Sequence, residues 1–186
     1  MTSETENQIL SKCKEGDKTS FRWVVQAYQR RMFSLALKML ADEEEAKDVV
    51  QETFIRAWQG LDAFDLQRSF PTWLYTIATR LCLNRLKRKR AIRPAESDEQ
   101  VLRRYASDTD SHHALENREW VSMVRLMAEG LSSKQRLVFT LCQLEGLPSS
   151  EVEKITGMNA RQVKSNLYAA RQTIRKRLKG LGYDED

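Results

Sequence analysis

The last third of the chain carries the pattern that most restricts its fold. Residues 146–157 predict a short helix that ends at a glycine, and the turn at residues 157–159 leads into a longer helix. In this longer helix the apolar residues recur every three or four positions and therefore share one face: Val163, Leu167, Ala170, Ile174 and Leu178. The opposite face presents Lys164, Ser165, Tyr168, Arg171 and Arg175.

The longer helix is also strongly cationic, with no acidic residue between positions 160 and 180. Two helices braced across a glycine turn, one with a basic outer face, are typical of proteins that place a helix in the DNA major groove. The alternative interpretation is a solvated basic helix on the outside of a bundle. The agreement of turn, apolar stripe and charge favours DNA binding.

Helical patterns also dominate the rest of the chain, because 186 residues contain only three prolines and seven glycines and show no alternating strand pattern. The periodicity predicts helices near residues 9–15, over 19–40, from Asp42 to about 61, and from 72 to about 89. Asp42 and Glu45 have the spacing of a capping box, and so do Ser132 and Gln135. We therefore predict an all-α fold.

Charge is segregated along the chain although the net charge is only +5. Acids crowd residues 42–52, and the middle of this predicted helix turns Asp48, Gln51, Glu52 and Ile55 outward. Basic residues crowd positions 85–93, and the helix after Pro71 has an outward stripe of Arg80, Asn84, Lys87 and Arg88. One surface is thus suited to nucleic acid and another to a basic protein.

A change of composition divides the chain into two domains. Residues 92–115 mix one proline with serines and acids, which predicts a flexible acidic linker between helical domains at residues 1–91 and 116–186. At about 3.3 Å per residue, roughly 25 linker residues could reach about 80 Å. The two domains could therefore contact distant parts of one large partner.

Several classes of function find no support in the sequence. Cys13, Cys82 and Cys142 are odd in number and widely spaced, which argues against disulfides and a zinc site. His112 and His113 stand in a polar stretch, and no catalytic carboxylate pair, activated nucleophile or phosphate-binding loop occurs. We therefore expect no enzyme activity, no cofactor and no metal. The acidic N-terminus and the lack of a long apolar run predict a cytoplasmic protein without membrane insertion.

Two stretches resemble a known family. Residues 48–58 read DVVQETFIRAW and residues 69–78 read SFPTWLYTIA, and a basic run follows. Together they are similar to the second conserved region of bacterial extracytoplasmic-function (group IV) sigma-70 factors, and the helix-turn-helix resembles their fourth region. The resemblance covers most of the chain. It implies a factor that binds core RNA polymerase, recognises the −10 and −35 promoter elements and opens the DNA.

The resemblance also implies roles for particular residues. The acidic helix would dock on the polymerase clamp coiled coil, and the fourth region would dock on the flap; the docking residues are Asp48, Gln51, Glu52 and Ile55. The loop at 62–70 would capture a flipped base, and the helix after it would contact −10 DNA, through Phe64, Asp65, Gln67, Arg68, Arg80, Asn84, Lys87 and Arg88. The −35 element would be read by Arg161, Gln162, Lys164, Ser165, Asn166, Tyr168, Arg171 and Arg175.

Some positions depart from the family pattern. Pro148 replaces the usual capping serine, so we expect Ser149 or Ser150 to cap that helix, and Asn166 and Ala169 replace frequent arginines. These changes predict weak independent −35 reading and help from a recruiting factor in finding promoters. Separately, the resemblance implies an anti-sigma factor as a candidate partner, because family members are commonly held inactive by one that covers the polymerase-binding faces. Two alternatives stay open here. The linker is either a plain tether or a strand that enters the polymerase channels, and the whole chain could instead be a stand-alone helix-turn-helix regulator.

Overall fold

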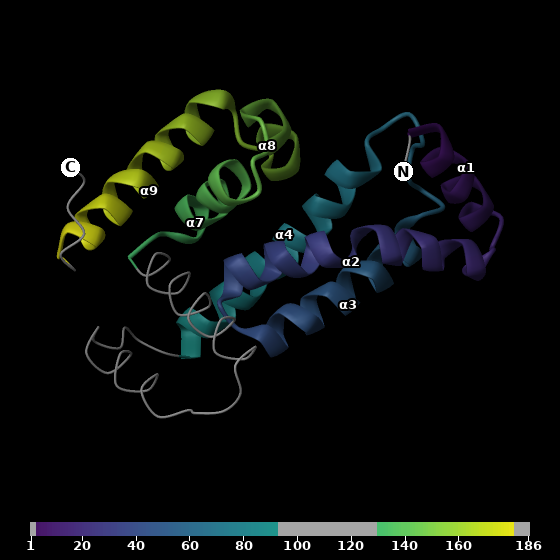
Figure 1. Ribbon diagram of the computed structural model, residues 1–186, viewed down its shortest axis with the longest axis horizontal. Helices are drawn as coiled ribbons and strands as arrows, with labels where there is room; N and C mark the ends of the chain where they lie inside the picture. The colour runs from purple at the N-terminus through teal and green to yellow at the C-terminus, as the bar shows by residue number, and fades with distance from the viewer. Residues whose placement is uncertain (1–2, 93–129, 181–186) are drawn as a thin grey trace.

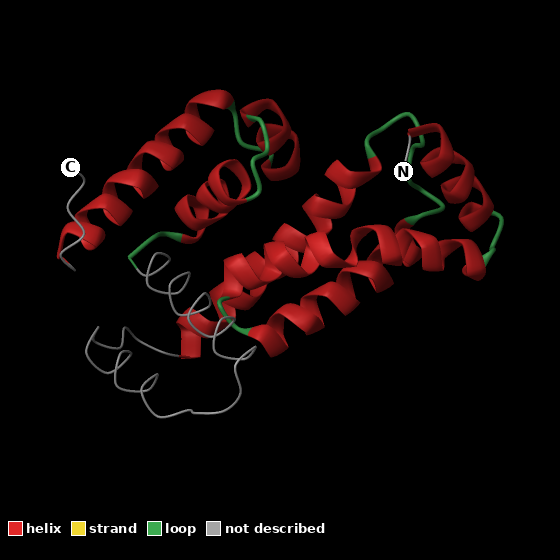
Figure 2. Ribbon diagram, viewed as in Figure 1, coloured by secondary structure: helices red, strands yellow, loops and turns green. Residues whose placement is uncertain are grey.

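A computed structural model describes residues 3–92 and 130–180, and every regular element in these two ranges is helical (Figures 1 and 2). The elements are α1 (Ser3–Lys14), α2 (Lys18–Leu40), α3 (Glu43–Gly60), α4 (Phe70–Ile92), α7 (Ser133–Phe139), the π-helical turn η1 (Thr140–Leu144), α8 (Ser149–Thr156) and α9 (Ala160–Gly180). The all-α prediction is confirmed. The predicted linker, beyond its first residue, and the two histidines lie outside the described residues.

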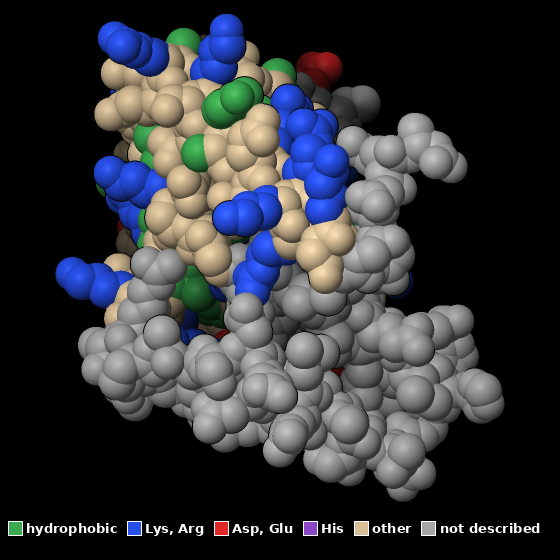
Figure 3. Space-filling model, turned by 90° about the vertical axis from the view of Figure 1, so that its left-hand side faces the viewer, with side chains coloured by type: hydrophobic (Ala, Val, Ile, Leu, Met, Phe, Trp, Pro, Cys, Tyr) green, Lys and Arg blue, Asp and Glu red, His purple; other side chains and the backbone are tan. Residues whose placement is uncertain are grey.

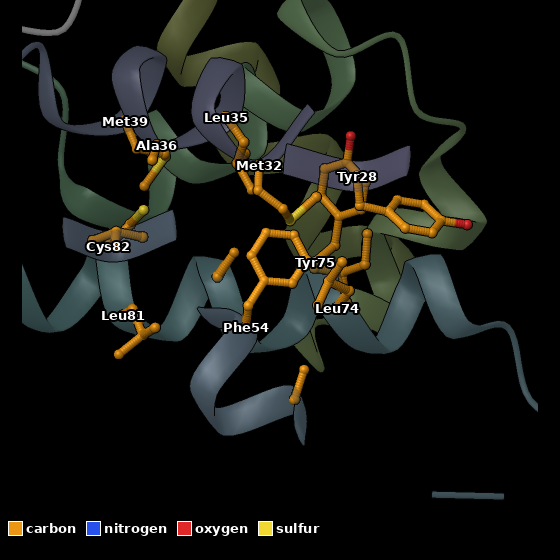
Figure 4. Close-up of a cluster of buried hydrophobic side chains, with 14 of the residues drawn as sticks. Tyr28, Met32, Leu35, Ala36, Met39, Phe54, Leu74, Tyr75, Leu81 and Cys82 are labelled. Carbon is orange, nitrogen blue, oxygen red and sulfur yellow. The ribbon is translucent and has the colours of Figure 1, made fainter. Parts of the chain in front are cut away.

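The first four helices pack around a common apolar core. The buried residues of α2 recur at helical spacing, as Val24, Tyr28, Met32, Leu35 and Met39. Side chains from α2, α3 and α4 point toward one another in this core (Figure 4). Each buried aliphatic or aromatic side chain contributes about 1.5–3 kcal/mol relative to an exposed one. The periodicity of these apolar residues therefore selects which face of each helix is covered.

Capping side chains set where α2 and α3 begin. The Asp17 carboxylate accepts hydrogen bonds from the backbone N–H groups of Thr19 (2.8 Å) and Ser20 (3.3 Å) at the start of α2. Asp42 accepts from the Glu45 N–H at 3.1 Å, as the predicted capping box requires. The Glu45 carboxylate, however, pairs with Arg85 of α4 at 2.8 Å. The acid that the sequence assigns to a local cap thus ties α3 to α4.

The second helical group is built from α7, η1, α8 and α9. Ser132 and Gln135 form the predicted capping box at the start of α7. The predicted serine cap of α8 is wrong, because Pro148 is the N-cap residue, without a side-chain cap, and both serines lie inside the first turn. Gly157 ends α8 with φ 71°, a left-handed conformation that glycine adopts without steric cost. This corner turns the chain from α8 into α9.

The two helical groups lie against each other in Figure 1, with α8 and α7 beside α4 and η1 beside α2. Apolar residues of the second group, including Leu137, Val138 and Leu141, belong to the same buried cluster as the core of the first. α1 and the end of α9 lie at opposite ends of the molecule (Figure 1). This packing places α9 outside, with one long face uncovered.

Candidate functional site

The sequence predicts a strongly cationic outer face on α9, and the structure leaves this face exposed. Val163, Ala170 and Ile174 are buried, as their spacing predicts. The exposed residues include Arg161, Gln162, Lys164, Ser165, Tyr168, Arg171 and Arg175. Tyr168 has 65% of its surface exposed, and Lys and Arg side chains are spread over this end of the molecule (Figure 3). The helix can thus present cations and one aromatic ring to a groove of anionic DNA.

Some predicted −35 residues are already engaged within the second helical group. Gln162 and Asn159 exchange hydrogen bonds across the first turn of α9, each side-chain oxygen accepting from the other's backbone N–H at 2.9–3.0 Å. The Asn166 amide donates to the carbonyl of Gln162 at 2.8 Å, and Arg171 donates to Gln143 at 3.0 Å. This capping pair was not predicted from the sequence, although Asn159 and Gln162 have the spacing of a capping box. The side-chain amides of Gln162 and Asn166 are therefore less available for hydrogen bonds to DNA bases.

A second basic stripe runs along α4. Arg80, Asn84, Lys87 and Arg88 are all exposed, whereas Leu81 and Cys82 between them are buried. The predicted outward direction of these four residues agrees with the structure. The neighbouring Arg85 points the other way, toward α3. Basic residues of α4 are thus divided between a free stripe and a structural contact.

The acidic face of α3 is similarly divided. The Asp48 side chain is 65% exposed, Gln51 is exposed, and Ile55 keeps 49% of its surface exposed. Glu52 is paired twice, with Arg56 of the same helix at 2.6 Å and with Arg85 at 3.3 Å. Glu52 therefore contributes to holding α3 and α4 together, and Asp48, Gln51 and Ile55 form the accessible part of the predicted docking face.

Beside this face lies an apolar groove that was not predicted from the sequence. It occupies about 740 Å³ between α2 and α3, and its apolar walls are Phe21, Val25, Phe33, Val50, Phe54, Ile55 and Trp58. The sequence pattern that could have indicated the groove is a second apolar stripe on α2, at positions 21, 25 and 33, next to the stripe that faces the core. The groove gives the polar docking face an apolar neighbour that a partner helix could fill.

The loop between α3 and α4 differs from expectation at its aromatic residue. Phe64 is only 5% exposed and packs against Phe70 and Trp73, with ring centroids 5.6 Å and 4.7 Å away. In this structure the ring has no open face on which a base could stack. Asp65, Gln67 and Arg68 are exposed, and Asp65 accepts from the Gln67 N–H at 2.9 Å. The sequence alone could not separate a core phenylalanine from a pocket phenylalanine in a loop.

Comparison with known proteins accounts for this arrangement. Family models for Sigma-70 region 2 and Sigma-70, region 4 match residues 24–92 and 122–174. The RNA polymerase sigma-H factor of Pseudomonas aeruginosa is 31% identical over 191 residues, covering 97% of both chains. The ECF RNA polymerase sigma-E factor of Escherichia coli K12 is 30% identical over 180 residues (91% and 92% covered), and the ECF sigma factor SigW of Bacillus subtilis is 29% identical over 179 residues (92% and 96%). The chain belongs to the extracytoplasmic-function sigma factors.

Solved structures agree with this sigma-factor fold. CnrH, solved in complex with the cytosolic domain of CnrY, superimposes with a TM-score of 0.69 at 20% identity, with 94% of this chain and 97% of CnrH covered. RpoE of Bartonella quintana, in complex with the anti-sigma factor NepR, gives 0.62 at 19% identity, with 86% and 96% covered. This chain is an RNA polymerase sigma factor with regions 2 and 4. Within its described residues, no helix combines the length and apolarity that crossing a bilayer requires.

Proposed function

We propose that this sigma factor, as a group IV member, binds core RNA polymerase through α3 and places its two basic helices on promoter DNA. The proposed domains are residues 1–91 and 116–186, joined by residues 92–115. One observation carries the proposal: exposed basic stripes on α4 and α9 occur in the same chain as a separate acidic and apolar face on α3. Its place of action would be the cytoplasm, with the polymerase and DNA.

Polymerase docking on the clamp coiled coil is assigned to Asp48, Gln51 and Ile55, with Glu52 in a supporting role. An exposed carboxylate and amide accept hydrogen bonds from basic side chains, and Ile55 adds apolar area next to the groove. Such complementarity favours correct orientation and fast association. The second helical group would dock on the flap.

Promoter contacts are assigned to two elements. Arg80, Asn84, Lys87 and Arg88 would meet −10 DNA, with Asp65, Gln67 and Arg68 of the preceding loop near a flipped base. Phe64 is left out of this assignment because its ring is buried. Flipping a base out of the duplex costs a few kcal/mol of free energy, so contacts between the loop and the base must offset part of this cost.

We further propose that reading of the −35 element is weak. The Gln162 side chain accepts from the Asn159 N–H and the Asn166 side chain donates to the Gln162 carbonyl. This leaves Arg161, Lys164, Ser165, Tyr168, Arg171 and Arg175 to contact the −35 element. Lysine and arginine contacts with phosphates give salt-dependent affinity but little sequence information. A recruiting factor would then contribute to promoter choice, and an anti-sigma factor is a candidate regulator.

The test is in vitro transcription with purified core polymerase, this protein and a library of promoter templates, followed by mapping of start sites. We expect initiation to depend on this protein and to tolerate changes in the −35 bases better than changes in the −10 bases. No start sites above those of core polymerase alone would refute the sigma-factor mechanism. Initiation that is lost on changing only the −35 bases would refute weak −35 reading.

A further inference from the structure

A buried carboxylate joins the two helical groups. Glu145 follows η1, and its side chain is only 8% exposed. One carboxylate oxygen lies 2.6 Å from Nζ of Lys38 and accepts from the Ser34 hydroxyl at 3.3 Å. The other oxygen accepts from the Tyr75 hydroxyl at 3.1 Å. A single side chain of the second group is thus held by three donors of α2 and α4.

The π-helical turn presents this carboxylate. In η1 the Glu145 N–H bonds to the Thr140 carbonyl, five residues earlier, at 2.9 Å. The Leu144 carbonyl lies at the C-terminal end of η1, and Lys38 donates to it as well, at 2.9 Å. Single π-helical turns of this kind are often found at functional sites. Here the turn aims two acceptors at one lysine.

Two further polar contacts cross between the groups. Arg136 donates to the Met39 carbonyl at 2.8 Å, and the Thr72 hydroxyl bonds to Glu151 at 3.2 Å. The apolar residues between them belong to one continuous cluster. The two helical groups therefore share an apolar interface with paired polar groups at its edge. We call this packing of the two groups the closed arrangement.

The chemistry of the ion pair makes this contact reversible. Lys38 is 13% exposed and Glu145 is 8% exposed, so both charges have lost most of their water. The attraction within a buried pair is largely offset by this desolvation, and both groups regain hydration when the surfaces separate. Removing one partner alone is different, because it leaves the other charge buried without compensation.

Promoter geometry conflicts with the closed arrangement. Elements centred at −10 and −35 are 25 base pairs apart, about 85 Å of duplex at roughly 3.4 Å per base pair. The contact residue Thr72 lies eight residues before Arg80 in α4, a rise of about 12 Å. Its partner Glu151 is ten residues before Arg161. The −10 and −35 faces are therefore held too close together to occupy both elements at once.

We propose that Glu145 is a latch that holds this sigma factor in a closed, inactive arrangement, which must open before both promoter elements are bound. This inference rests on the proposed function for its consequence, but the closure itself is a property of the free chain. Opening requires the Glu145–Lys38 pair and the apolar contacts beside it to separate. The latch is therefore a point at which a partner can control the factor.

Small-angle X-ray scattering of the full chain tests the closure without polymerase. A compact chain of this length has a radius of gyration of about 16 Å. We expect the wild type to lie near that value and Glu145→Gln and Lys38→Met to exceed it by roughly 5 Å or more, because separated domains are farther from the common centre. The double variant should open no further than either single variant, since both remove one interaction. Circular dichroism checks that each variant keeps its helices.

The control is Glu15→Gln, which removes an exposed carboxylate after α1 and should leave the scattering unchanged. An open wild type, or Glu145→Gln and Lys38→Met variants as compact as the wild type, would overturn the latch. Transcription supplies the second readout. If about a tenth of the wild type is open, the variants should need about tenfold less protein for half-maximal initiation. Failure of the wild type to activate polymerase would refute the proposed function while leaving the scattering result intact.

Discussion

Single charged residues divide the acidic face of α3 between structure and docking. Arg85 reaches from α4 to Glu45 at 2.8 Å and Glu52 at 3.3 Å, and its side chain is 24% exposed. Asp48 lies farther away, at 3.8 Å, and is 65% exposed. Reversing the charge of residue 52, as in Glu52→Lys, would place a cation beside Arg85 and disturb the contact between α3 and α4. Asp48 is therefore the cleaner probe of docking.

Asp48→Lys should weaken binding to core polymerase by about tenfold, because it places a cation opposite basic partner side chains. The measurement is fluorescence anisotropy of the labelled protein with core polymerase at moderate salt. Glu44→Lys is the matched control, since it makes the same charge change on the same helix at a side chain that is 83% exposed. Equal losses in the two variants would point to net charge, and no loss in Asp48→Lys would remove α3 from the interface.

Buried thiols contribute to the response of the fold to alkaline pH. Burial raises the pKa of Cys82 to about 12, and burial together with Asp17 raises the pKa of Cys13 to about 11, from an ordinary value of 9.0. A raised pKa in the folded state stabilises the fold below the unfolded value, and this stability is lost as pH rises toward the folded value. The free energy of unfolding should therefore fall as pH rises from about 9 toward about 12 in urea titrations. Cys82→Ala should show a shallower fall, and an identical fall would assign the effect to other groups.

At the scale of elements, one face of α9 packs into the second helical group and the other presents cations to solvent. Val163, Ala170 and Ile174 hold it in the second helical group, and its first turn is closed by Asn159 and Gln162. Lys164 and Arg171 remain exposed. The helix can therefore lose outer cations without losing its position in the fold.

Lys164→Ala combined with Arg171→Ala should reduce the salt dependence of duplex DNA binding by about two phosphate contacts. The slope of log affinity against log salt concentration measures this number directly. Lys12→Ala, an exposed change on α1, is the control and should keep the wild-type slope. An unchanged slope in the double variant would mean that α9 does not lie along the phosphates.

Elements with strong periodicity could be predicted from the sequence, and contacts between distant elements could not. The apolar stripe of α9 and the Ser132–Gln135 cap follow from spacings of a few residues. The pairing of Lys38 with Glu145 joins positions 107 residues apart, and nothing local indicates it. The burial of Phe64 is also decided by tertiary packing, here against Trp73. Local rules therefore located the helices and their exposed faces, whereas tertiary contacts decided which face residues are accessible.

At the scale of the whole molecule, the two helical groups share one continuous buried cluster and a charged contact at its edge. Domains that share a core tend to unfold together, and domains that separate unfold independently. The closed arrangement therefore predicts cooperative unfolding of regions that belong to different DNA-contacting units.

Differential scanning calorimetry should show one main transition for the wild type and two overlapping transitions for Glu145→Gln, because the variant uncouples the groups. Glu15→Gln should keep the single transition. Two transitions in the wild type would show that the shared cluster contributes little coupling.

The helix α2 contributes to the core, to the apolar groove and to the contact with Glu145. One stripe fills the core, a second lines the groove at Phe21, Val25 and Phe33, and a third supplies Ser34 and Lys38 to Glu145. A saturation mutagenesis screen should consequently find its C-terminal half intolerant around nearly the full circumference. Adaptive change in this factor would then accumulate on α1 and on the outer side of α9, where a new side chain disturbs one task at a time.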